Sequence, residues 1–259
     1  MSSNYFVAGI QEIGQVAIFF TRLTGIFFRK GVRIRDIVHQ MFEAGVRSVP
    51  ITVTSGLFVG AIMAIQINEQ LKDFGAQSFL GGLTTSVTIR DVGPVLIGFL
   101  LSGKVGAYTI AELGTMKVTD QVAALECLGI DALEFIVLPR LVAVFISSFL
   151  LLVVGLTLTV FGGAYFSMLA LQINVQNYMN NVPQLITTAS IVVGVVKSLL
   201  FGMLIGVISC YKGYTTVGGA EGVGKSVKNG SVLILVWIVI LDFGISTLSR
   251  LIQEIFGVL

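Results

Sequence analysis

Five long apolar runs constrain this chain more than any other feature of its sequence. They are residues 50–68, 91–110, 138–169, 189–210 and 231–249. A helix of about 20 residues crosses the ~30 Å hydrocarbon core of a bilayer. With 55% hydrophobic and 12% charged residues, the chain lacks the ~25% of charged residues that is typical of soluble domains. The sequence therefore predicts an all-α integral membrane protein with about five transmembrane helices.

The third run, 138–169, is longer than one span requires. We expect it to be broken near Gly162 and Gly163. Splitting it in two would give six spans and would place the C-terminus on the other side of the membrane.

The distribution of lysine and arginine predicts the orientation of the spans. Twelve of these residues precede the first span or lie in or beside the segments that join the second span to the third and the fourth to the fifth. Only Lys72, Arg90 and Arg250 fall on the opposite side, and Lys197 lies inside a span. By the positive-inside rule, the N-terminus is cytoplasmic and the C-terminus lies outside.

Residues 1–49 precede the spans and are expected to form interfacial helices, which leaves 50–259 as the transmembrane domain. In residues 34–49, apolar side chains recur at helical spacing and charged side chains occupy the other face. This pattern indicates an amphipathic helix that lies along the inner leaflet. Residues 6–28 are more apolar but carry Glu12 and Arg22, so we interpret them as a second surface-lying or half-inserted helix.

Composition argues against several classes of function. A net charge of +2 is too small to favour nucleic acid. Cys127 and Cys210 lie far apart, and His39 is the only histidine, so the chain has little material for a metal centre or an activated nucleophile.

Residues 219–226, GAEGVGKS, match the phosphate-loop pattern, but that loop must follow a strand of a soluble α/β domain. We expect a tight inner loop there, and we predict no catalytic residue, no metal and no cofactor.

Small residues recur at every fourth position in three of the spans. This period places each set on one helix face, where helix backbones can approach closely. Such faces either pack tightly inside one subunit or slide around a transport path, and both readings stay open. The positions are Thr52, Gly56, Gly60 and Ala64; Gly98, Ser102 and Gly106; and Gly194, Ser198, Gly202 and Gly206.

The segment 111–140, between the second and third spans, is polar and charged. It contains an apolar stripe, and Gly129 is placed to end a short helix. That helix is too short to span a bilayer, so it is either a docking element at the cytoplasmic surface or a plain structural loop. The stripe consists of Val118, Val122, Leu125 and Leu128.

Ionisable residues in or beside spans are costly and usually face a partner or water. Arg90 and Asp91 stand at the outer start of the second span, where they either pair with neighbours, meet a lipid phosphate, or cap the helix with Asp91 at its positive end. Lys197 and Asp242 lie inside the fourth and fifth spans, and we treat them as isolated charges.

The outer segment 170–190 contains no charged residue and is rich in asparagine and glutamine. We expect a plain loop, with contact to a partner on the outer face as the alternative.

Two stretches of the chain resemble a known family. Residues 89–131 read IRDVGPVLIGFLLSGKVGAYTIAELGTMKVTDQVAALECLGID, and LPR follows at 138–140. This run, together with GGAEGVGKSVKNGSV at 218–232 and Asp242, is similar to the signature of the MlaE/YrbE permeases. The chain departs from the family pattern at Asp91, where the family usually has glutamate, and at Lys104, where it usually has arginine; lysine lacks the planar fork of arginine.

The resemblance implies a permease subunit of an ABC transporter that moves phospholipids between the inner and outer membranes, with no catalytic activity of its own. The expected partners are a second copy of the chain, a cytoplasmic ABC ATPase, a periplasmic Mce-domain protein and, optionally, a small cytoplasmic STAS-type subunit. The implied location is the cell inner membrane.

The resemblance also implies roles for particular residues. Residues 111–137 become a coupling segment that docks into the ATPase, with its helix near 116–128. Candidate coupling residues are Glu112, Met116, Lys117, Thr119, Asp120, Gln121 and Glu126. Candidate residues of the lipid pocket are Arg90, Asp91, Gly56, Gly60 and Gln66.

Two other functions stay open at this point. An ion-coupled secondary carrier of a small solute would need paired ionisable residues at mid-membrane and inverted repeats. A non-transporting membrane scaffold would tolerate bulky residues along the small-residue face from Gly194 to Gly206.

Overall fold

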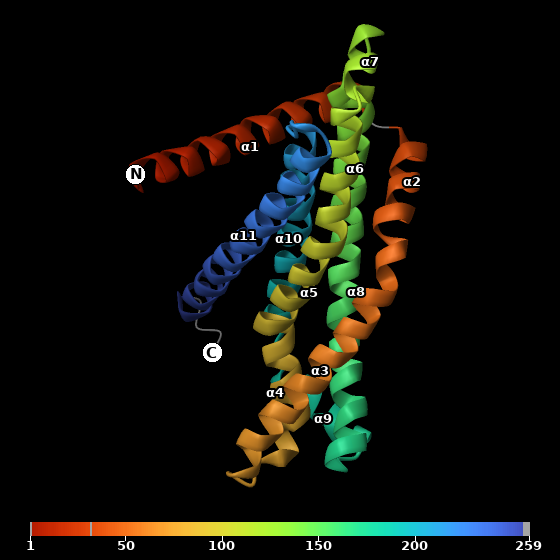
Figure 1. Ribbon diagram of the computed structural model, residues 1–259. Helices are drawn as coiled ribbons and strands as arrows, with labels where there is room; N and C mark the ends of the chain where they lie inside the picture. Colours follow the sequence, from red (N-terminus) through yellow and green to blue (C-terminus); the bar gives the residue numbers. More distant parts are fainter. Residues whose placement is uncertain (1, 32, 256–259) are drawn as a thin grey trace. The chain divides into compact units, whose positions relative to one another are not determined.

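The computed structural model describes residues 2–31 and 33–255, and every regular element in that part of the chain is helical (Figure 1). The α-helices are α1 (Ser2–Lys30), α2 (Ile34–Ala44), α3 (Val49–Lys72), α4 (Leu80–Val87), α5 (Gly93–Leu101), α6 (Ala107–Val118), α7 (Gln121–Cys127), α8 (Leu138–Leu171), α9 (Val175–Leu185), α10 (Thr188–Tyr214) and α11 (Gly219–Ile255). Short π-helical turns at Thr88–Val92, Ser102–Gly106 and Leu133–Val137 join α4 to α5, join α5 to α6 and precede α8.

Five helical stretches among the described residues are long and apolar enough to cross a membrane. They are Ile34–Lys72, Gln77–Val118, Leu133–Leu171, Thr188–Tyr214 and Gly219–Ile255. The prediction of an all-α membrane protein with about five spans is confirmed.

The third span is continuous, so the expected break near its glycines is wrong. Helix α8 runs without interruption through Gly162 and Gly163. A methyl group on Gly162 would overlap the backbone of Leu57 in α3, and one on Gly163 would crowd the side chain of Tyr178 in α9. These glycines therefore serve close helix packing rather than helix termination.

Two segments that we expected to be loops are helical. Residues 219–226 form the first two turns of α11, where Glu221 and Lys225 pair one turn apart. A phosphate loop would require these residues to leave the helix. In the outer segment, Asn174 caps α9 by accepting a 2.8 Å hydrogen bond from the Gln176 N–H, a common way to start a helix.

The chain packs as two units, each assembled from three stretches. The first unit comprises Met1–Val46, Ser102–Ser147 and Met203–Ile234, and the second comprises Arg47–Leu101, Ser148–Gly202 and Leu235–Leu259. In the first unit, Phe19 and Leu23 of α1 join a buried cluster with Leu113, Val137 and Tyr211.

In the second unit, α9 packs on α4, and α3 packs on α8 through small residues. A methyl group on Gly60 would overlap the carbonyl of Thr159, and one on Gly56 would crowd the carbonyl of Gly155. These contacts support tight packing as the role of this face of the first span.

One face of α2 is apolar and largely exposed. Ile34, Val38 and Phe42 follow one another at intervals of four residues, and each is more than half exposed. This is the amphipathic pattern that we predicted, and such a face suits contact with lipid.

Candidate functional site

The coupling segment, residues 111–137, contains a sharp turn followed by a short projecting helix. Helix α6 ends at Val118, and Asp120 adopts a left-handed conformation with φ of 58° immediately before α7. Gly129, with φ of 74°, follows the end of α7, as we predicted. Figure 1 shows α7 projecting from the end of α6.

Most of the candidate coupling residues are accessible in the first unit. Thr119, Asp120, Gln121 and Glu126 are exposed, whereas Glu112, Met116 and Lys117 are partly buried. The predicted apolar stripe does not form one buried face, because the turn at Asp120 redirects the chain: Val122 is buried, but Leu128 is 75% exposed.

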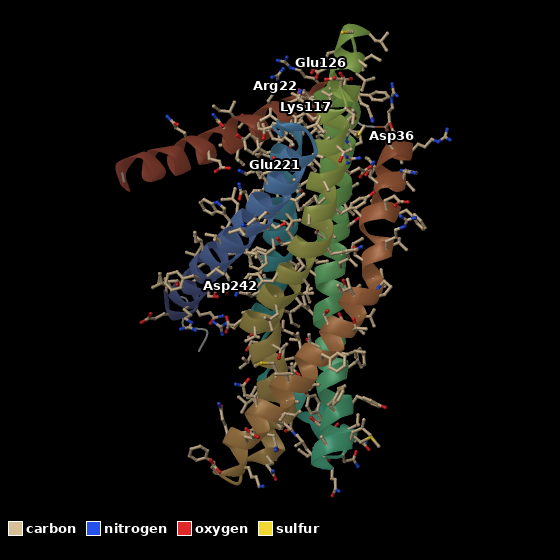
Figure 2. The ribbon with its side chains drawn as sticks, viewed as in Figure 1. Arg22, Asp36, Lys117, Glu126, Glu221 and Asp242 are labelled. Atoms are coloured by element: carbon tan, nitrogen blue, oxygen red, sulfur yellow. The ribbon has the colours of Figure 1, made fainter. Side chains whose placement is uncertain are left out.

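The end of α10 holds both helices of the coupling segment. The ammonium of Lys117 in α6 lies 4.9 Å from the ring centroid of Tyr214, and the hydroxyl of Tyr214 donates a 3.4 Å hydrogen bond to Glu126 in α7. Figure 2 places Lys117 and Glu126 in this part of the molecule. Neighbouring residues of α10 bind α1, since Lys212 pairs with Glu12 and Tyr211 donates a 2.6 Å hydrogen bond to Gln15.

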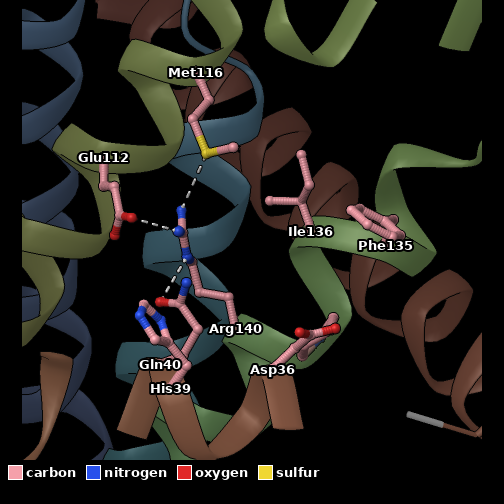
Figure 3. Close-up of a pocket in the computed structure, with 9 residues that line it drawn as sticks. Asp36, His39, Gln40, Glu112, Met116, Phe135, Ile136 and Arg140 are labelled. Carbon is pink, nitrogen blue, oxygen red and sulfur yellow. Dashed lines mark hydrogen bonds and ion pairs between the residues drawn. The ribbon is translucent and has the colours of Figure 1, made fainter. Parts of the chain in front are cut away.

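A buried arginine joins three helices of the first unit, its own and two others (Figure 3). Arg140 of α8 is 2% exposed, and its Nη2 forms a 2.8 Å ion pair with Glu112 of α6. Its Nε donates a 3.3 Å hydrogen bond to Gln40 of α2, and its Nη1 lies 4.0 Å from the sulfur of Met116. We call these four residues the Arg140 clasp.

Sequence reasoning counted Arg140 only as a positive charge on the inner side and did not consider Gln40. The available signal was the position of Arg140 in the run 138–169, where an ionised side chain needs a partner. Glu112 was predicted as a docking residue, and the structure places it inside the clasp.

The second unit contains a cluster of buried charges around Lys197. Its ammonium is 0% exposed and pairs with Asp242 of α11 at 2.7 Å and with Asp91 of the Thr88–Val92 turn at 3.6 Å. It also donates hydrogen bonds to the Arg90 carbonyl at 2.7 Å and to the Ser246 hydroxyl at 2.8 Å. Asp242 is thus the close ion-pair partner of the ammonium, and the Arg90 carbonyl and Ser246 accept its two hydrogen bonds.

This charge cluster corrects two of our interpretations. Lys197 and Asp242 are not isolated, because α10 and α11 bring them together. Asp91 does not cap a helix, because it lies inside the continuous helical stretch Gln77–Val118, several turns after that stretch begins. The side chain of Arg90 donates a 3.0 Å hydrogen bond to Gln253 of α11, a residue that the sequence analysis did not identify.

The other predicted lipid-pocket residues lie in different surroundings. Gly56 and Gly60 lie in the contact between α3 and α8, and Gln66 is exposed. The second unit has an apolar cavity of about 370 Å³, and the predicted residues are not among those that line it. Its lining includes Ile89, Phe161 and Val195.

The candidate spans and the charged helix that follows the second of them define a polytopic, all-α membrane protein. Comparison with known proteins narrows this class. The family model for the permease MlaE matches residues 37–248, and the chain belongs to the MlaE permease family.

Individual relatives agree with this assignment. A probable ABC transporter permease protein of Rickettsia bellii is 34% identical over 87% of this chain and 89% of its own length. A probable ABC transporter permease protein of Synechocystis is 32% identical over 90% of this chain and 92% of its own length. The chloroplastic protein TRIGALACTOSYLDIACYLGLYCEROL 1 of Arabidopsis thaliana is 32% identical over 82% of this chain and 61% of its own length.

Proposed function

We propose that this chain is the permease subunit of an ABC transporter that moves phospholipids between the inner and outer membranes. The observation that carries the proposal is the match to the MlaE permease family across residues 37–248. The proposed assembly contains two copies of the chain in the cell inner membrane, a cytoplasmic ATPase, a periplasmic Mce-domain protein and, where present, a STAS-type subunit. The N-terminus is cytoplasmic in this proposal, in keeping with the distribution of lysine and arginine.

In the proposed mechanism, the ATPase subunit binds α7 and the turn at Asp120. Their exposure supports this role, since a docking helix must be accessible. ATP hydrolysis in the partner displaces α7, and the contacts of Lys117 and Glu126 with Tyr214 deliver that displacement to α10. The spans then close the lipid pocket.

Purification of the full chain in mild detergent with its partners tests the assembly. We expect an ATPase and an Mce-domain protein to co-purify with bound phospholipid. Reconstitution of this complex between donor and acceptor membranes should give lipid transfer that requires ATP. Lipid transfer without an ATPase, or robust ATPase activity of the isolated chain, would contradict the proposal.

Variants of Asp120 test the coupling segment within that assay. Asp120→Lys should reduce lipid transfer while leaving membrane insertion intact. Asp120→Asn removes the charge but keeps a residue that tolerates the left-handed conformation, and it therefore separates charge from backbone strain. Asp73→Lys, at an exposed position outside the segment, is the matched control and should transfer lipid normally.

The pair formed by Lys197 and Asp242 favours one second candidate, the ion-coupled carrier, because that function needs paired ionisable residues within the spans. It predicts uptake of a small solute driven by an ion gradient in vesicles that contain this chain alone. Membership of the ABC permease family favours the first proposal.

A further inference from the structure

The side chain of Arg140 binds three groups through its three nitrogen atoms. Nη2 holds Glu112, Nε holds Gln40, and Nη1 contacts the sulfur of Met116. The partners come from α2 and α6, while Arg140 belongs to α8. A planar guanidinium presents its donors in a fixed fork, so it fixes the directions of both partner helices; a lysine ammonium has no such fork.

The clasp lies where the two ends of the coupling segment meet. Glu112 lies at the start of the coupling segment and Arg140 lies just after its end, so their ion pair closes the segment at its base. Gln40 lies in α2, and only residues 45–48 separate α2 from the long helix α3.

Burial makes the clasp a specific junction rather than a surface contact. Arg140 is 2% exposed, and removing one partner from a buried ion pair is far more costly than breaking an exposed pair. The clasp also borders a pocket of about 250 Å³ whose lining includes Asp36, His39 and Phe135 (Figure 3).

We propose that Arg140 is a positioning residue that ties the base of the coupling segment to α2. Displacement of α7 then moves α2 together with α6 and α8. This inference rests on the proposed function for its role in transport, but the mechanical link is a property of the chain alone.

The link is tested in the full chain in lipid nanodiscs by electron-spin distance measurement. One spin label is placed on Cys127 of α7, which is exposed, and one on α2 at the exposed position of Arg35 through Arg35→Cys. Cys210 is fully buried and leaves the labelling selective. The labelled chain is mixed with an excess of unlabelled chain, so that the measured distances lie within one copy, and the parent protein should then give one narrow distance distribution.

Two variants loosen the clasp in different ways. Arg140→Lys keeps the charge that faces Glu112 but loses the fork, and Gln40→Leu removes only the contact with α2. Both should broaden the distance distribution and reduce its main peak. Glu221→Gln, which breaks the exposed pair with Lys225, is the matched control and should leave the distribution unchanged. If Arg140→Lys fails to fold, Gln40→Leu keeps the buried ion pair and carries the test.

The same variants are then assayed with the ATPase partner for lipid transferred per ATP hydrolysed. A coupling energy typical of such networks predicts a loss of roughly 2- to 30-fold, with the affinity for the ATPase unchanged. Unchanged distances in Gln40→Leu would overturn the link, and altered distances with unchanged transfer per ATP would overturn its role in coupling. If the parent protein moves no lipid with any ATPase, the proposed function fails, and the distance measurement still decides whether the link exists.

Discussion

Replacement of Lys197 by methionine probes the charge cluster of the second unit with little change in side-chain length. The ammonium is fully buried, and its ion-pair partner and its two hydrogen-bond acceptors lie at 2.7–2.8 Å. Its removal leaves Asp242 without its cation in the interior. Breaking a buried ion pair from one side costs about 3–5 kcal/mol. With roughly 2–4 °C per kcal/mol for chains near this size, we expect the thermal midpoint to fall by roughly 6–20 °C.

The assay is thermal denaturation of the detergent-purified chain, with the folded fraction measured by size-exclusion chromatography. Repeating it at several heating rates separates a change in equilibrium stability from a change in the rate of irreversible unfolding. The double variant Lys197→Met with Asp242→Asn removes both charges of the close pair and should recover most of the loss, since Asp91 is 37% exposed and keeps its hydrogen bond from Ser246. Lys225→Met, in an exposed ion pair, is the control and should melt within about 2 °C of the parent. A single variant as stable as the control, or a double variant as unstable as the single one, would refute the argument.

Three further predictions concern the second unit. Gly60→Leu forces a side chain into the carbonyl of Thr159 and should cost about 1–3 kcal/mol, whereas Gly244→Leu, which meets open space, should leave the thermal midpoint unchanged. Asn174→Ala removes the cap of α9 and should cost about 1 kcal/mol, measured as faster amide exchange in that helix; unchanged exchange would refute the cap. Burial raises the pKa of Tyr178, so the folded state keeps its phenol neutral at a pH where the unfolded chain ionises. Stability should therefore be insensitive to this group below about pH 10 and fall above it, and Tyr178→Phe should remove that part of the fall in parallel midpoint measurements.

The spans were predictable because their signal is local. A run of about 20 apolar residues specifies a membrane helix by its length and composition alone, whatever it packs against. Gly129 was predictable for a similar reason, because a residue with positive φ at a helix end is usually glycine. These features depend only on neighbours in the sequence.

Features that depend on packing were predicted wrongly. Gly162 and Gly163 suggested a break, but they let α8 approach α3 and α9. The glycines of 219–226 suggested a loop, yet that segment starts α11. In a membrane, a glycine inside a helix favours close packing as readily as a break, and the sequence does not distinguish the two.

The two buried cations show why pairing could not be predicted from the sequence. Lys197 and Asp242 are 45 positions apart and Glu112 and Arg140 are 28 apart, so neither pair follows helical spacing within one element. Each cation instead joins three helical elements of its own unit. Arg140 joins α2, α6 and α8, and Lys197 joins the Thr88–Val92 turn, α10 and α11.

A single cation in an apolar run is therefore better interpreted as a junction between helices than as a marker of topology. The low-dielectric interior makes such a cation costly without a carboxylate, so its presence predicts a partner on another helix. Arg140 is such a cation, so it should not be counted among the twelve inner-side charges, just as Lys197 was not. Eleven inner charges against three outer ones still predict a cytoplasmic N-terminus. The orientation and the Arg140 clasp thus rest on different residues, and a test that overturns one leaves the other standing.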